Sequence, residues 1–240
     1  MRKLGIISDI HGNFEALEVV LEELKRRGVD KIYCLGDIVG YNPNPCECIE
    51  KIKTNNIVSI KGNHERAVLS ITPIYHFNPV AREAIIWTME RLSKEDMEFL
   101  KNLPDKIIND FCFVHGSIRD PDHYIFSGSD AIKEFYALEE IGKKFLFFGH
   151  THVQGAFVLK KDELLFTNSR FNLNDCSYAI INPGSVGQPR DGDWRAAAAI
   201  LDDNGWVEFI RLAYPIDKVI EKIEKSGLPR WLGERLKKGI

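Results

Sequence analysis

Six short apolar runs in this chain each end in an aspartate, asparagine or histidine, usually beside a glycine. Continuous apolar runs are typical of strands that are buried on both faces. In open α/β sheets, ligands bind at the carboxyl ends of the strands. We therefore expect one polar site, assembled from distant segments. The polar junctions are Asp9 to His11, Gly36 to Asp37, Gly62 to Glu65, His115 to Gly116, Gly149 to His152 and Asn182 to Ser185.

The first 60 residues alternate strand and helix patterns. After Asn13, which can cap a helix, apolar residues recur every three or four positions until Gly28. The expected elements are strands at 4–8, 31–35 and 57–60 and helices at 14–27 and 46–53. This order predicts a parallel sheet with helices on its faces.

The stretch 65–104 has helical character and is predicted to be an insertion. Asn78 and Pro79 can begin a helix that reaches Leu92, and Ser93 begins a capping box for a second helix that ends before Pro104. No linker is evident, so we expect one domain over 1–240, closed by a helical tail at 215–240 that is broken at 227–229. The expected strands beyond 106 are 111–114, 145–148, 156–160, 164–167, 178–181, 196–201 and 207–212.

Composition excludes several classes of protein. The 240 residues carry a formal charge of −3 and no apolar run of the roughly 18 residues that a membrane span needs. We therefore expect no membrane and no nucleic-acid partner. Five scattered cysteines favour reduced thiols and a cytoplasmic location. Cys46 and Cys48 lack the second pair of ligands that a structural zinc site requires.

The polar junctions hold five of the seven histidines, together with two aspartates and Asn63. Such groups can converge in a protein interior only if something cationic lies between them. Nitrogen and oxygen donors without thiolate favour Mn²⁺, Fe, Zn²⁺, Co²⁺ or Ni²⁺. Eight donors are too many for one metal with an open position, so two ions that share a carboxylate fit better.

The ordered motifs at residues 9–11, 36–37, 62–65, 115–116 and 149–152 resemble those of the calcineurin-like metallophosphoesterases. The segment 182–190 resembles a sixth motif of small bacterial and archaeal members, which include phosphodiesterases and diadenosine tetraphosphatase-like proteins. The resemblance implies a two-sheet α/β/β/α sandwich of mixed sheets with flanking helices. It also implies that Asp9, His11 and His152 hold one metal, that Asn63, His115 and His150 hold the other, and that Asp37 bridges them.

The same resemblance implies hydrolysis of a phosphate ester through a metal-bridging hydroxide, with Mn²⁺ as the favoured metal. A phosphodiester or dinucleotide is the expected substrate, and a monoester is less favoured. His64 would lie beside the metals without binding them and would stabilise the transition state or protonate the leaving oxygen. Asn63, His64 and Arg190 are the expected contacts of the substrate, and Arg190 can match phosphate oxygens with its planar fork.

Other hydrolase and nucleotide-binding classes lack their signatures. The first strand is followed by DIHGN rather than a dinucleotide-binding turn, and there is no P-loop and no His-Glu-x-x-His. Ser117, Ser127 and Ser185 lie near glycines without a nucleophile elbow. A nuclease and a protein Ser/Thr phosphatase are weaker variants. The alternative from another class is a non-catalytic scaffold on the same fold, which the presence of His64 disfavours.

Substrate choice is poorly specified by the sequence. The insertion at 65–104 and two polar loops at 116–130 and 168–177 could form the rim of the site. Side chains that could face a base or sugar are Tyr41, His76, His123 and Tyr124. In the tail, Arg235, Lys237 and Lys238 are expected to be a solvated helix end. Trp231 and Leu232 could form a contact in a homo-oligomer.

Overall fold

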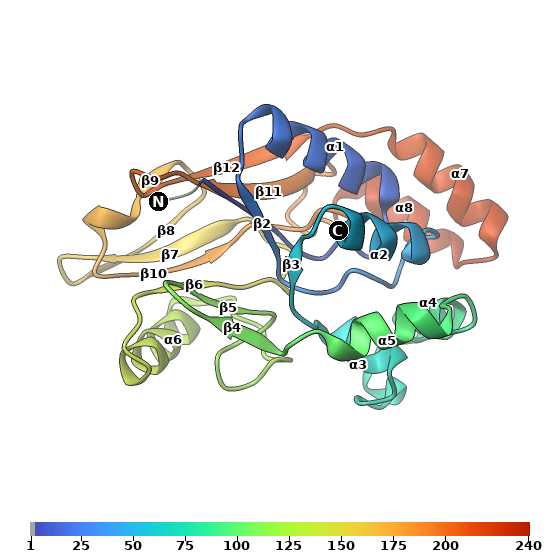
Figure 1. Cartoon of the computed structure of the whole chain (residues 1–240), viewed down its shortest axis with the longest axis horizontal. Coiled ribbons are helices and arrows are strands. Elements are labelled where there is room, and N and C mark those ends of the chain that lie inside the picture. Colours follow the sequence, from blue (N-terminus) through green and yellow to red (C-terminus); the bar gives the residue numbers. More distant parts are fainter. Residues whose placement is uncertain (1–2) are drawn as a thin grey trace.

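Two six-stranded mixed sheets pack face to face, with helices on both outer sides (Figure 1). The computed structural model describes residues 3–240. The first sheet has the order β3-β2-β1-β11-β12-β9. Its strands are β1 (Leu4–Ile7), β2 (Lys31–Cys34), β3 (Val58–Ser59), β9 (Phe171–Asn172), β11 (Ala196–Leu201) and β12 (Trp206–Leu212). β1, β2 and β3 are parallel, as predicted, and β11 pairs antiparallel with β1.

The second sheet has the order β4-β5-β6-β10-β7-β8. β5, β6 and β10 are parallel, and the outer strands of this sheet pair antiparallel. The strands are β4 (Lys106–Ile108), β5 (Cys112–Val114), β6 (Phe145–Phe147), β7 (Gly155–Lys160), β8 (Glu163–Thr167) and β10 (Tyr178–Asn182). The architecture is therefore the predicted sandwich of mixed sheets.

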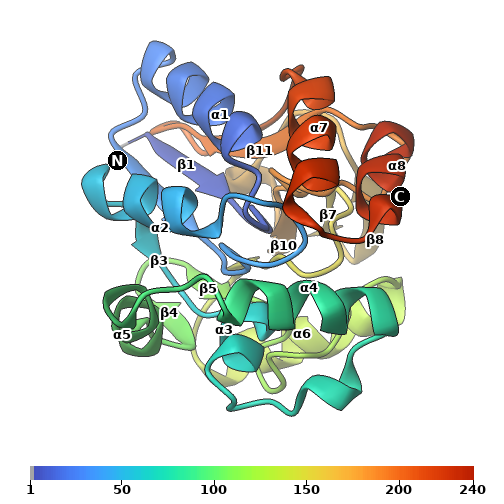
Figure 2. The same cartoon turned by 90° about the vertical axis from the view of Figure 1, so that its right-hand side faces the viewer.

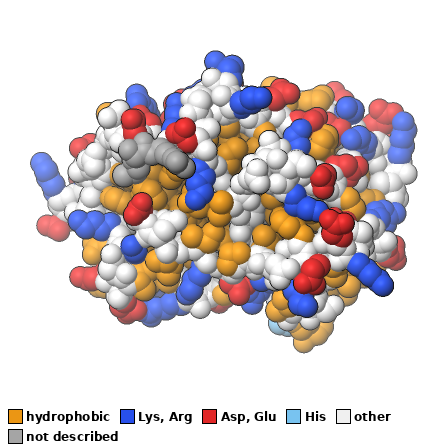
Figure 3. Space-filling view, in the orientation of Figure 1, with side chains coloured by type: hydrophobic (Ala, Val, Ile, Leu, Met, Phe, Trp, Pro, Cys, Tyr) orange, Lys and Arg blue, Asp and Glu red, His pale blue; other side chains and the backbone are white. Residues whose placement is uncertain are grey.

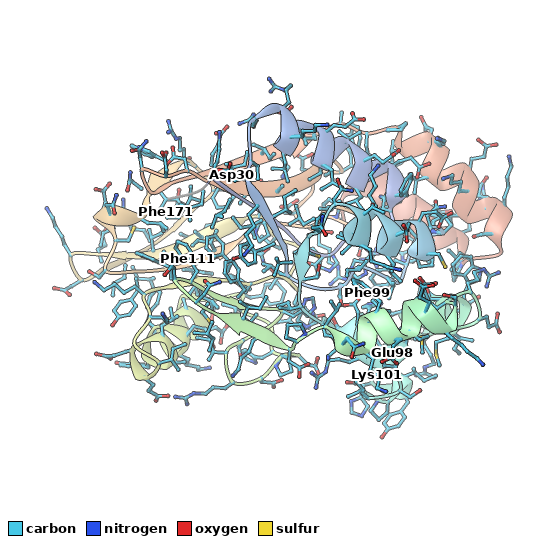
Figure 4. The ribbon with its side chains drawn as sticks, viewed as in Figure 1. Asp30, Glu98, Phe99, Lys101, Phe111 and Phe171 are labelled. Carbon is cyan, nitrogen blue, oxygen red and sulfur yellow. The ribbon has the colours of Figure 1, made fainter. Side chains whose placement is uncertain are left out.

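The space between the sheets is filled by a hydrophobic core to which both sheets contribute. Ile6 of β1 and Phe113 of β5 are completely buried there. Phe111 and Phe171 lie at one end of this layer (Figure 4). Neighbouring residues on a strand point to opposite faces, so Ile7 packs into the core beneath the outer helices instead. Burial on both faces explains why these strands have continuous apolar sequences.

Helices cover the outer face of each sheet. The first sheet packs against α1 (Phe14–Arg26), α2 (Pro45–Thr54), α7 (Ile216–Ser226) and α8 (Arg230–Lys238), and the second packs against α6 (Gly128–Glu140). Figure 2 shows α4 (Pro79–Met89), α5 (Lys94–Asn102) and the short α3 (Asn63–Val68) grouped on one side of the molecule. Short 3-10 turns occur at Ile74–His76 and Leu173–Asp175. No helix within residues 3–240 is long and apolar enough to cross a membrane.

Most predicted elements are confirmed, and within residues 3–240 four α-helices and strands were not predicted, besides the two 3-10 turns. β4, α3 and β9 are short, and their sequences carry little periodic signal. α6 is the larger omission, because it was assigned partly to a polar loop at 116–130. Its signal is present in the sequence: Ser127 and Asp130 form a capping box, and Ala131, Phe135 and Leu138 make one buried face.

Candidate metal centre

Four residues from three segments form the first donor group, which comprises Asp9, His11, Asp37 and His152. One donor atom from each lies within 4.8 Å of the others, and all four side chains are buried. His152 Nε2 is 3.3 Å from Asp9 Oδ1, and His11 Nε2 is 3.5 Å from Asp37 Oδ2. The loops after β1, β2 and β6 supply these side chains. The carboxyl ends of parallel strands therefore meet across the two sheets, as the sequence predicts.

A second donor group shares Asp37 with the first. Asp37, His115 and His150 have donor atoms within 4.8 Å of one another. His115 Nε2 lies 3.4 Å from Asp37 Oδ2 and 3.0 Å from Asn63 Oδ1, so Asn63 joins this group. All seven residues that were predicted as metal ligands are thus brought together, in two sets with one common carboxylate.

The backbone at these positions is strained. Ten non-glycine residues within 3–240 have positive φ, and five of them are predicted ligands. Tyr41, which lines the same site and is not a ligand, is another of the ten. A side chain in this region costs on the order of 1–3 kcal/mol, and such strain clusters at functional sites. The strained ligand residues are Asp9, His11, Asp37, His150 and His152, with φ between 50° and 66°.

Backbone carbonyl groups fix the orientation of the imidazoles. A carbonyl can only accept, so each bonded ring nitrogen must be the donor, and in a neutral imidazole the other nitrogen keeps its lone pair. The Nδ1–H groups of His11, His115 and His152 face the carbonyls of Val39, Leu35 and Gln188, and the Nε2–H group of His150 faces that of Asp122.

This arrangement leaves lone pairs directed at each other. His11 Nε2 and His152 Nε2 are only 3.2 Å apart, and the Nδ1 proton of each ring is already used. Two acceptors at this distance repel unless a cation lies between them. The donor set therefore fits divalent transition-metal ions, with neutral imidazoles, carboxylates and one amide oxygen.

The protonation of the site supports the same conclusion. Burial lowers the pKa of three ligand imidazoles, His11, His150 and His152, which favours the neutral form that can bind a metal. Burial lowers the pKa of His64 as well. Burial is the largest single influence at His115 and acts in the same direction, but Asp37, Asp9 and the hydrogen bond to the Leu35 carbonyl together outweigh it and raise the pKa of His115 to about 10. Without a metal, the His115 imidazole is thus protonated, and its positive charge offsets part of the negative charge of Asp9 and Asp37.

His64 lies next to both groups without belonging to either. Its backbone N–H donates to Asp37 Oδ1 at 2.9 Å, and its ring packs against His11 and Tyr41 with centroids 4.6 Å away. The ring is buried, and Nδ1 has no hydrogen-bond partner. A Cβ atom at Gly40, where φ is +98°, would collide with Nδ1, so only glycine leaves room for this ring.

Glu65 has a structural role that the sequence analysis did not assign. Its carboxylate is fully buried and accepts four backbone N–H groups, from Asp37, Ile38, Val39 and Gly62, at 2.7–3.1 Å. Burial raises the pKa of Glu65 and Asp37 adds to this, so these donors are needed to hold it ionised. Glu65 therefore ties the turn after β2 to the turn that carries Asn63.

Glu65→Ala should destabilise the protein strongly, because it leaves several buried N–H groups without an acceptor. We expect the free energy of unfolding to fall by about 3 kcal/mol or more, which lowers the melting temperature by roughly 6–12 °C in a chain of this size. Thermal unfolding followed by circular dichroism measures this. Glu98→Ala is the matched control, because Glu98 lies exposed on α5 (Figure 4). Similar melting temperatures for both variants would contradict the assigned role.

The segment 182–190 holds the ligand-bearing turns in place through hydrogen bonds to their backbone. Asn182 Nδ2 donates to the carbonyl of Gly149 at 2.8 Å, and Ser185 Oγ donates to that of Asp9 at 2.7 Å. The backbone N–H of Gly187 also donates to Asp9, at 3.0 Å. This explains in physical terms why the sequence continues with a polar, glycine-rich turn at the end of β10.

The donor groups open into a cavity of about 440 Å³. Three of the four side chains that could face a base or sugar line it, namely Tyr41, His76 and Tyr124, while His123 lies outside and faces Asp130. Arg190 also lines the cavity. Arg235 was predicted to be part of a solvated helix end, and this is wrong: α8 docks so that Arg235 reaches the cavity, whereas Lys237 and Lys238 remain exposed.

Comparisons with known proteins agree with this fold. The uncharacterized protein MJ0912 of Methanocaldococcus jannaschii is 39% identical over 97% of this chain and 96% of its own length. The crystal structure of a metallophosphoesterase from Sphaerobacter thermophilus has a TM-score of 0.86 at 40% identity and covers 100% of this chain and 99% of that one. Phosphodiesterase YfcE of Escherichia coli is 24% identical over 85% of this chain and 89% of its own. A model of the calcineurin-like phosphoesterase superfamily domain matches residues 2–204, and the chain belongs to this superfamily.

Proposed function

We propose that the protein is a hydrolase that uses two divalent metal ions to cleave a phosphodiester in a small, nucleotide-like substrate. The observation that carries this proposal is the pair of donor groups that share Asp37 at the base of the cavity. A shared carboxylate suits two ions a few ångströms apart. Such a pair, when bound, would supply an activated water and offset the charge of a phosphoryl group.

Each metal has an assigned set of residues. Asp9, His11 and His152 would hold one ion, and Asn63, His115 and His150 would hold the other, with Asp37 shared. The donors are nitrogen and oxygen atoms without thiolate, for which we favour Mn²⁺ over Fe, Zn²⁺, Co²⁺ and Ni²⁺. Two carboxylates against two divalent ions leave a net positive charge, which favours a phosphate anion.

The remaining cavity residues would bind and orient the substrate. His64 lines the cavity next to Asp37, where it can stabilise a phosphoryl oxygen or protonate the leaving oxygen. Arg190, from a segment distant in sequence, also lines the cavity and can pair with phosphate oxygens. Asn63 would offer its side-chain amide to the substrate. Tyr124 packs on the His150 ring with centroids 3.8 Å apart, which leaves an aromatic wall beside the metal centre.

Two further observations favour a small phosphodiester as the substrate. The relative YfcE is described as a phosphodiesterase. Charges of both signs are mixed over the face shown in Figure 3, without the basic stripe that a nucleic-acid substrate would favour. The alternative is that the protein keeps the fold and acts only as a scaffold.

Metal content and turnover together test the proposal. After reconstitution with Mn²⁺ and removal of free metal, we expect about two ions per chain by plasma mass spectrometry. The loaded protein should hydrolyse bis(p-nitrophenyl) phosphate faster than p-nitrophenyl phosphate. A metal content near zero would refute the binuclear centre. Two bound ions without turnover of any phosphate ester would favour the scaffold.

A further inference from the structure

Two guanidinium groups from distant parts of the chain flank the ring of Tyr41. The carbon between the guanidinium nitrogens lies 6.0 Å from the ring centroid for Arg190 and 5.6 Å for Arg235. Arg190 Nη2 also donates to the Tyr41 hydroxyl at 3.3 Å. All three side chains line the cavity that holds the metal donor groups.

Neither arginine pairs with an aspartate or a glutamate. Within residues 3–240, no Asp or Glu oxygen lies within 4.0 Å of either guanidinium, although Arg195, Arg211 and Arg230 all have such partners. Arg190 and Arg235 are both partly buried, and burial together with Arg190 lowers the pKa of Arg235. The positive charge of Arg235 is therefore disfavoured by its burial and by the neighbouring Arg190, and a bound anion would offset this.

The position of Arg235 is fixed by several contacts. Leu232 and Leu236 of α8 are buried in the core on either side of it. After α8, the N–H of Gly192 donates to the carbonyl of Gly239 at 2.9 Å, and Gln188 Nε2 donates to the backbone oxygen of Ile240 at 2.7 Å.

This docking connects Arg235 to the metal centre. Gln188 also accepts the Nδ1–H of His152 through its carbonyl, so one residue orients both a metal ligand and the end of α8. Arg235 Nε donates to Ile240, which leaves its terminal nitrogens free to bind an anion.

We propose that Arg190, Tyr41 and Arg235 form a second anion subsite beside the metal centre, which binds a non-scissile phosphate of the substrate. The substrate class is then a phosphodiester that carries an additional phosphate group, as in a phosphorylated dinucleotide. This inference rests on the proposed function, in which the two metals bind the phosphate that is cleaved. Guanidinium groups suit the second phosphate, since their planar forks bind its oxygens in pairs.

Calorimetry with the Mn²⁺-loaded protein tests the subsite without requiring turnover. The two probes are adenosine 5′-monophosphate and adenosine 3′,5′-bisphosphate, which differ by one phosphate. We expect the wild type to bind the bisphosphate about 10-fold or more tightly, the gain expected for one charged hydrogen-bonded pair. Arg235→Gln should remove most of this preference. Lys237→Gln, which removes the same charge from an exposed position on α8, should keep it.

The outcomes separate the two proposals. Equal affinity of the wild type for both probes, or an unchanged preference in Arg235→Gln, would overturn the subsite. If Arg235→Gln unfolds, Arg235→Lys replaces it, because lysine keeps the positive charge but lacks the planar fork. A reduced preference for the bisphosphate in Arg235→Lys would support the subsite, and a full preference would overturn it. Hydrolysis of bis(p-nitrophenyl) phosphate is measured separately. A subsite that binds the bisphosphate in a protein without turnover would leave this inference standing and refute the proposed function.

Discussion

Asp37→Asn should release both metals and abolish phosphodiester turnover. Asp37 is the only residue common to the two donor groups, so its carboxylate is expected to contact both ions. An amide keeps the shape but loses the negative charge and one good ligand oxygen. We expect turnover to fall by about 10³-fold or more, because metal activation of water and clamping of the phosphoryl group are lost together.

Metal content after desalting and turnover of bis(p-nitrophenyl) phosphate are the measurements. The fold should persist, because the amide oxygen of the substituted side chain can still accept the N–H of His64 and Glu65 still holds the backbone of this turn. Asp122→Asn is the control: this residue also lines the cavity but belongs to neither donor group, so both ions should remain. Two ions retained at wild-type affinity in Asp37→Asn would refute the bridging role.

The ligands of the candidate site could be predicted because they follow the carboxyl ends of buried strands. A buried strand has a continuous apolar sequence, and the residue after it must turn at the sheet edge. Asp9 and Asp37 follow β1 and β2 closely, so their convergence follows from the parallel pairing of these strands. His115 follows β5 of the other sheet, and the packing of the two sheets brings it to them. The resemblance to the calcineurin-like metallophosphoesterases then implied two sets of ligands, and the structure brings the members of each set together.

Other parts of the site depend on tertiary packing that no local pattern reveals. Arg235 has the sequence context of an exposed helix end, and only the docking of α8 against Gln188 and Gly192 brings it to the cavity. Glu65 resembles an ordinary acidic residue in the first turn of a helix, but its carboxylate binds backbone groups from another strand end. In both residues, a long side chain reaches a segment that is distant in sequence.

The same distinction explains the fold. α1 and β11 were predicted within a residue or two, since burial of one face imposes a helical period on α1 and burial of both faces gives β11 a continuous apolar sequence. β9 has only two residues, and pairing with β12 holds it in place. Its strand conformation is thus a consequence of its neighbour rather than of its own sequence.

His64→Ala should reduce turnover by about 10²-fold or more while both metals remain bound. The ring lies against His11 and lines the cavity, but it is not among the metal donors, and the N–H that bonds to Asp37 is a backbone group that the substitution retains. Metal content should therefore match that of the wild type. His123→Ala is the matched control, because that imidazole lies outside the cavity and should not affect turnover.

The leaving group of the substrate reveals what the His64 ring does. If His64 protonates the leaving oxygen, its loss matters most for a basic leaving group, which cannot depart without a proton. His64→Ala should then lose more activity on the phenyl ester of thymidine 5′-phosphate than on the p-nitrophenyl ester. Equal losses on the two esters would instead assign the ring to stabilising a phosphoryl oxygen, which both reactions share. Unchanged turnover of both esters, with two metals bound, would remove His64 from the chemistry altogether.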